Sequence, residues 1–139
     1  AYVTGIAYLK LNEVALVFAP NRRVVALPDD LASQVTRVPR TTAAGTPGEL
    51  LVVHRRDGSA TAPWVIFLHG NAANVTTGGN VSRYRQLLDL GAHVVAPEYP
   101  GYGRLDGAPS EAGAVAAARD AWAWLRATGV APDRIVIYG

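Results

Sequence analysis

The chain has 139 residues, of which 50% are hydrophobic and 17% are charged, and its formal net charge is +2. A chain of this length and composition can bury a core, which excludes an intrinsically disordered protein. The lack of cysteine excludes disulfides, thiolate catalysis and cysteine-bound metals, and the scattered arginines lack the basic and aromatic stripe typical of nucleic-acid binding.

The first segment, residues 2–19, is apolar except at Lys10, Asn12 and Glu13. These three polar residues interrupt the run of about 20 apolar residues that a membrane-spanning helix needs. No basic stretch precedes the segment, as one would in a signal peptide. The pattern predicts an amphipathic helix, or a helix followed by a short strand, and we assign residues 1–22 as an N-terminal extension. An anchor upstream of the chain stays open.

Three strands are predicted before the middle of the chain. Residues 34–41 alternate apolar and polar side chains, which is typical of an exposed strand. Residues 44–48 are rich in glycine and proline and predict a turn into a second strand over residues 49–54. Residues 63–68 form a continuous apolar run, which indicates a strand buried on both faces.

From residue 63 onward, predicted strands alternate with predicted helices. A helix over residues 80–90 precedes a strand over residues 92–97, which Pro97 ends early. A second helix begins after an N-cap at Ser110 and ends at Gly129, and a last strand covers residues 134–138. The apolar stripe of the second helix is Ala114, Val115, Ala118, Ala121, Trp122 and Leu125. This alternation predicts a parallel α/β sheet with helices on its faces.

Two loops that follow predicted strands carry the candidate chemistry. Residues 69–72 lie beyond the end of a buried strand, where small residues can direct backbone N–H groups at a ligand, as an oxyanion hole requires. An ordinary strand-to-helix turn explains the same residues equally well. The second loop, residues 98–107, contains Gly101-x-Gly103, which suggests a dinucleotide site. The next helix starts only at Ser110, too late for that fingerprint, so a nucleotide cofactor is not predicted.

Other polar residues are assigned structural roles. The three histidines, His54, His69 and His93, are not spaced as metal ligands, so no metal site is predicted. Asn74 and Asn80 each begin a glycosylation sequon, and we interpret them as ordinary loop asparagines.

Four short motifs occur in a defined order in the second half of the chain. They are Leu68-His-Gly-Asn-Ala72, Tyr99-x-Gly-Tyr-Gly103, Gly107-x-Pro-Ser-Glu111-x-Gly113 and Asp133-Arg-Ile-Val-Ile-Tyr-Gly139. In order and spacing they resemble the BEM46-like α/β-hydrolases, the group that includes the ABHD13- and ABHD17-type serine hydrolases. Glu98 and Pro100 depart from the aspartate and arginine usual in that group.

This resemblance implies an α/β-hydrolase fold. Residues 1–139 would form the N-terminal half of a single domain, a mostly parallel sheet flanked by helices and cut at the nucleophile elbow. The implied activity is serine-dependent cleavage of carboxylic esters through an acyl-serine intermediate, with thioesters and lipid acyl esters as further candidates. A non-catalytic α/β-hydrolase-like binding module is the alternative.

The resemblance also assigns roles to individual residues. The N–H of Asn71 would be one oxyanion-hole donor, and His69 and Gly70 would support its loop. In this fold the triad follows the chain order serine, acid, histidine. All three are expected beyond Gly139, so this chain is expected to be inactive alone. Asp106, Glu98 and Asp120 are not assigned to the triad.

The expected partners are a small acyl ester and the C-terminal half of the same domain. No cofactor and no nucleic acid is expected, and membrane association stays open. The single lysine against twelve arginines is typical of a high-GC bacterial gene. We therefore expect a bacterial protein, located in the cytoplasm or associated with the cytoplasmic side of a membrane.

Overall fold

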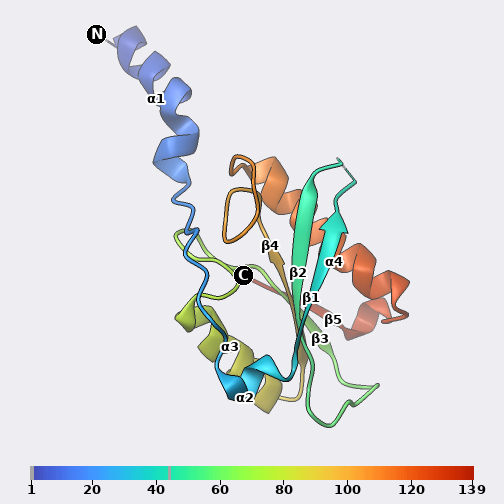
Figure 1. The fold of residues 1–139 in the computed structure, drawn as a ribbon. Coiled ribbons are helices and arrows are strands. Elements are labelled where there is room, and N and C mark those ends of the chain that lie inside the picture. The colour runs from blue at the N-terminus through green and yellow to red at the C-terminus, as the bar shows by residue number, and fades with distance from the viewer. Residues whose placement is uncertain (1, 44) are drawn as a thin grey trace.

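The computed structural model describes residues 2–43 and 45–139, and its centre is a five-stranded sheet in the order β1-β2-β4-β3-β5 (Figure 1). Its strands are β1 (Val35–Thr41), β2 (Pro47–Val53), β3 (Trp64–Phe67), β4 (His93–Glu98) and β5 (Ile135–Tyr138). The strands predicted from residue 63 onward, β3, β4 and β5, pair in parallel as expected. β1 and β2 add two antiparallel pairings, so the sheet as a whole is mixed. Ala44, in the turn predicted over residues 44–48, lies outside the described residues.

Helices cover both faces of this sheet (Figure 1). The helices of the structure are α1 (Tyr2–Val17), α2 (Asp29–Ala32), α3 (Gly78–Asp89) and α4 (Glu111–Ala127), with a short 3-10 turn η1 (Pro132–Arg134) before β5. α2 and α3 pack on one face of the sheet, and α4 packs on the other.

Neighbouring residues of the central strands contribute to different cores, because successive side chains point to opposite faces of a sheet. In β4, Val94 and Ala96 pack toward α3, whereas Val95 packs toward α4. In β3, Val65 packs toward α3 and Ile66 packs toward α4. Every residue of β3 and β4 is buried, which explains why these strands are continuous apolar runs in the sequence.

β4 extends one residue past the end predicted at Pro97, to Glu98. The pairing between β3 and β4 ends at Ile66 and Val95. Proline has no N–H to donate, but Pro97 lies beyond the part of β4 that pairs with β3, so β3 needs no N–H from it. This extension brings Glu98 to the carboxyl end of the sheet.

The stripe predicted for α4 is partly wrong. Ala117, Ala121 and Leu125 form its buried row at i, i+4 spacing, whereas Val115 and Trp122 are exposed. Two alanines in that row allow the helix to lie close to the sheet. The predicted N-cap is confirmed, since the Ser110 hydroxyl accepts a hydrogen bond of 3.0 Å from the Gly113 N–H.

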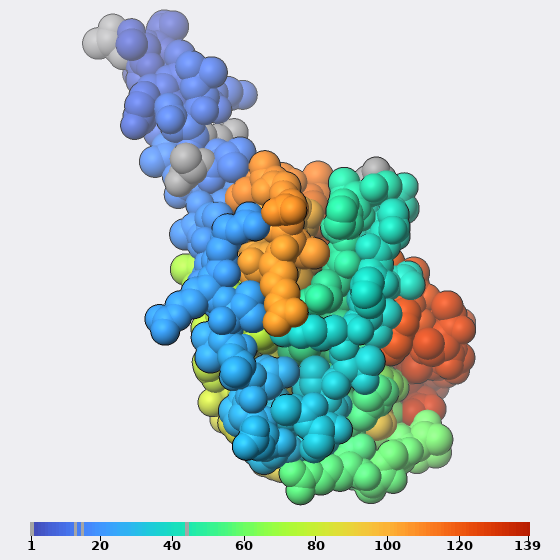
Figure 2. All heavy atoms as spheres, in the orientation of Figure 1, coloured from blue at the N-terminus to red at the C-terminus, as the bar shows by residue number. Residues whose placement is uncertain are grey.

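α1 projects away from the rest of the molecule (Figures 1 and 2). A helix is confirmed over Tyr2–Val17, but the predicted amphipathic pattern is wrong, because large apolar side chains are exposed along its length; in the described residues no strand directly follows it. Its exposed large apolar side chains are Tyr2, Val3, Ile6, Tyr8, Leu9, Leu11, Val14, Leu16 and Val17. Within the described residues, no helix has the length and apolarity needed to cross a membrane.

β5 lies at the edge of the sheet and pairs with β3. Val136, Ile137 and Tyr138 are exposed, so this edge is apolar. Leu68 N–H donates a 2.8 Å hydrogen bond to Tyr138 O, which brings the end of β5 beside the loop that follows β3.

Candidate functional site

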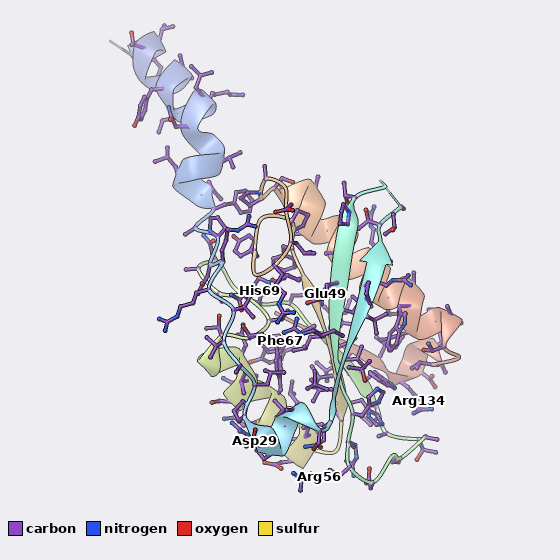
Figure 3. All side chains as sticks on the ribbon, viewed as in Figure 1. Asp29, Glu49, Arg56, Phe67, His69 and Arg134 are labelled. Carbon is purple, nitrogen blue, oxygen red and sulfur yellow. The ribbon has the colours of Figure 1, made fainter. Side chains whose placement is uncertain are left out.

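The candidate site is built on the loop that leaves β3, at the carboxyl ends of β3 and β4. His69 is the second residue after β3 and lies in the interior of the molecule (Figure 3), only 4% exposed. Its Nε2 atom is 2.9 Å from Glu98 Oε1, and its Nδ1 atom is 3.1 Å from Gly70 O. The ring of Tyr99 packs on the imidazole with their centroids 4.0 Å apart, and Tyr99 Oη donates to His69 O. These contacts hold His69 within the loop, and its supporting role stays a prediction.

Glu98 holds the other side of this loop. Its carboxylate is buried, and Oε2 accepts a hydrogen bond of 3.3 Å from the Val75 N–H. Gly103 closes the space around this carboxylate, because a Cβ at residue 103 would lie 2.2 Å from Glu98 Oε2. Gly103 also has φ +52, a conformation that favours glycine. Gly103 of the second loop thus makes room for a buried acid.

The side chain of Asn71 joins the loop to the end of α1. Its Oδ1 atom accepts hydrogen bonds of 2.8 Å from both Ala19 N–H and Tyr102 Oη. Its Nδ2 atom donates to Val17 O at 2.5 Å. Both the oxygen and the nitrogen of the side-chain amide make hydrogen bonds, which leaves the backbone N–H as the donor for contact with a ligand.

Asn71 is one of the residues that line a cavity. Of the residues that the structure describes, none accepts a hydrogen bond from the Asn71 N–H. Ala72, the next residue, has φ 60, a strained conformation for a residue other than glycine. A cavity of about 280 Å³ is lined by Val17, Phe18, His69, Gly70, Asn71, Tyr99, Tyr102, Ser110 and Ala114. The three residues predicted for the site, Asn71, His69 and Gly70, are thus together at one cavity.

The tyrosines at this site are hydrogen-bond donors. Burial, reinforced by the nearby Glu98 carboxylate, raises the pKa of Tyr99 to about 12. The same causes raise the pKa of Tyr102 above its ordinary value. Both hydroxyls therefore stay protonated at neutral pH and donate to His69 O and Asn71 Oδ1.

Asn74 has a larger role than the sequence suggested. It is completely buried, and its Nδ2 atom donates to Asn21 O at 2.9 Å and to Arg23 O at 3.0 Å. Its Oδ1 atom accepts from the N–H and the hydroxyl of Thr76, both at 2.8 Å. Asn74 therefore fastens the segment after α1 to the candidate loop. Asn80, the other asparagine interpreted as a loop residue, lies in α3.

His54 and His93 lie at the opposite end of the strands from His69. His93, buried in β4, accepts from Arg55 N–H at Nδ1, and its Nε2 is 2.9 Å from Ser59 O. Burial, with a contribution from His93, lowers the pKa of His54. No group of three potential metal-binding side chains occurs in residues 2–43 and 45–139.

No family model matches the chain. It is 34% identical over 88 residues to lysophosphatidylserine lipase ABHD12 of Danio rerio, which covers 62% of this chain and 22% of that protein. It is 27% identical over 150 residues to the uncharacterised protein MT2364 of Mycobacterium tuberculosis, covering 99% of this chain and 51% of that protein. The chain thus spans about 22% of the length of the first of these curated relatives.

Solved structures show the same architecture. The esterase Pf2001 of Pyrococcus furiosus superposes with a TM-score of 0.69 at 20% identity, covering 85% of this chain and 44% of that chain. An alpha-beta hydrolase from Vibrio vulnificus superposes with a TM-score of 0.64 at 23% identity, covering 85% and 42%. The strand order, the helices on both faces and these superpositions together show that the chain has the α/β-hydrolase fold.

Proposed function

We propose that this chain belongs to a serine hydrolase of the BEM46-like group that cleaves carboxylic esters, with the Asn71 N–H as one oxyanion donor. The observation that carries this proposal is the unpaired Asn71 N–H at a cavity beyond the carboxyl ends of β3 and β4. Ligands of open α/β sheets bind at this edge. The zebrafish relative is named a lipase and the Pyrococcus neighbour an esterase, which supports ester hydrolysis.

The position of β5 supports the same reaction. A Cβ built on Gly139 would lie 3.4 Å from Leu68 Cβ, and Leu68 directly precedes the candidate loop. A nucleophile elbow that continued from β5 would therefore begin beside His69 and Asn71. In acyl transfer, the serine oxygen attacks the ester carbonyl, whose oxygen becomes an anion that preorganised N–H donors stabilise. Asn71 would supply one donor, and the residue after the serine the other.

The test is direct assay of the complete protein. We expect hydrolysis of p-nitrophenyl acetate or butyrate, and covalent labelling of one serine by a fluorophosphonate, a reagent that phosphonylates activated serine hydroxyls. Mass spectrometry of the labelled peptide would identify the serine. If the complete protein showed no hydrolysis and no labelling, the proposal would be overturned and a non-catalytic binding module would be favoured.

We further propose that α1 holds the protein at a lipid membrane. Large apolar side chains such as Leu9, Leu11 and Leu16 are 58%, 85% and 58% exposed. Apart from the polar residues Lys10, Asn12 and Glu13, apolar residues occur along the whole of α1, and exposed apolar surface of this extent marks a site of membrane or protein interaction. The exposed pair Arg22 and Arg23 follows the helix, which complements anionic lipid headgroups. We expect this surface to be the cytoplasmic face of a bacterial membrane.

Co-sedimentation with phosphatidylglycerol–phosphatidylcholine vesicles tests this second proposal. Burying one leucine contributes roughly 1.5–3 kcal/mol, so the double variant Leu11→Glu, Leu16→Glu should lower vesicle binding more than tenfold. Leu90→Glu is the matched control, because Leu90 is 82% exposed at the end of α3 on the body of the molecule. Equal losses in both variants, or wild-type protein that stays in the supernatant, would contradict the proposal.

A further inference from the structure

We infer that Glu98 is a positioning residue, whose carboxylate fixes the candidate loop at two points and so sets the direction of the Asn71 N–H. The inference rests on the proposed function of this site. Glu98 is 3% exposed and is not among the described residues that line the cavity, so it acts through the loop rather than on substrate.

The two anchor points lie on either side of Asn71. Glu98 Oε1 is 2.9 Å from Nε2 of His69, two residues before Asn71. Glu98 Oε2 accepts from the N–H of Val75, four residues after it, at 3.3 Å. Between the anchors, Ala72 takes a left-handed conformation at φ 60. Such strain persists only where the surroundings over-determine the backbone, and two contacts with one buried carboxylate provide this constraint.

The hydrogen-bond partners of His69 favour one tautomer of its ring. Gly70 O can only accept, so its contact with Nδ1 favours the tautomer that carries a hydrogen on Nδ1. The Nε2 atom then shares one further proton with Glu98 Oε1, as imidazolium with carboxylate or as imidazole with carboxylic acid. In either form every donor has an acceptor, which a buried polar pair requires.

The packing leaves this carboxylate little freedom to move. Gly103 Cα closes one side, because a Cβ there would lie 2.2 Å from Glu98 Oε2. The Tyr99 ring covers His69 at a centroid distance of 4.0 Å. A smaller side chain at residue 98 would therefore leave His69 Nε2 and Val75 N–H without partners in a closed space.

Two substitutions separate positioning from charge. Glu98→Ala removes both contacts. Glu98→Gln can keep both, because its amide oxygen can accept from Val75 N–H while its amide nitrogen donates to the unprotonated Nε2 of His69. A loop displacement of about 1 Å can cost 10²-fold in rate, so we expect Glu98→Ala to lower kcat by about 10- to 100-fold with little change in KM. Glu98→Gln should restore kcat to within a few-fold of wild type.

The matched control is Glu49→Gln, assayed in the complete protein with a p-nitrophenyl ester. Glu49 pairs with Glu98 across β2 and β4, but its carboxylate bonds to Arg37 and not to the loop. This variant should leave kcat unchanged. Unchanged kcat in Glu98→Ala, or an equal loss in Glu98→Gln, would overturn the inference.

Amide hydrogen exchange tests whether Glu98 anchors the loop without relying on the proposed activity. Exchange at Val75 should accelerate in Glu98→Ala and remain slow in Glu98→Gln, and the ¹⁵N shifts of His69 should report a hydrogen on Nδ1 in both wild type and Glu98→Gln. If the wild-type protein hydrolyses no ester, the proposed function fails while these measurements still decide the anchoring. Unchanged exchange at Val75 in Glu98→Ala would disprove the anchoring itself.

Discussion

Replacing Asn71 by proline is expected to lower kcat for ester hydrolysis by about 10²- to 10³-fold, or roughly 3–4 kcal/mol of barrier. The reason is that proline has no N–H, so the proposed oxyanion donor would be lost while the rest of the cavity remains. Gly70 precedes it, and the absence of a Cβ there reduces the steric clash that proline usually makes with the residue before it. Steady-state kinetics on the complete protein would measure the loss, with circular dichroism as the check on folding.

Asn71→Ala is the control, because it keeps the N–H and removes only the side-chain contacts. Those contacts join Asn71 to Val17 O, Ala19 N–H, Ala72 N–H and Tyr102 Oη. We expect alanine to be several-fold less active than wild type but well above proline. A folded proline variant with full activity would show that the oxyanion assignment is wrong.

Asn74→Ala is expected to reduce the free energy of unfolding by about 3–4 kcal/mol, because leaving each buried polar group unpaired costs about 1–3 kcal/mol. The substitution removes the partners of Asn21 O and Arg23 O, in a partly buried site, and the partner of the buried Thr76 N–H. Urea denaturation monitored by tryptophan fluorescence would measure the change.

The neighbouring asparagine provides a control for that substitution. Asn80 Nδ2 makes one hydrogen bond, 2.8 Å to Asn74 O, and the site is only partly buried. We expect Asn80→Ala to cost about 1 kcal/mol. Equal destabilisation by the two variants would refute the special role of Asn74.

The sequence predicted the parts of this fold that depend on local patterns. β3 and β4 have helices on both sides and so appear as unbroken apolar runs, and the Ser110 cap marks the start of α4. The loop carrying Asn71 was predicted because it follows a buried strand. These features are fixed by residues adjacent in the chain.

The missed features depend on residues that meet only after folding. Glu98 and His69 are 29 residues apart and become neighbours because β4 and β3 pair in parallel. Asn74 and Asn21 are 53 residues apart, and the sequon pattern at Asn74 gave no signal of burial. For α4, helical periodicity allowed several stripes, and the close approach of the sheet to Ala117 selected one of them.

The hydrogen bond from Asn71 to Val17 links two events that are otherwise separate in space. One is the seating of α1 on the body of the molecule, and the other is the alignment of a backbone donor in the cavity. Linkage between two equilibria is reciprocal. A ligand that fixes Asn71 would therefore stabilise the contact between α1 and the body, and that contact would strengthen ligand binding by the same free energy. Ligand binding in the cavity and the position of α1 would then be thermodynamically linked through this one hydrogen bond.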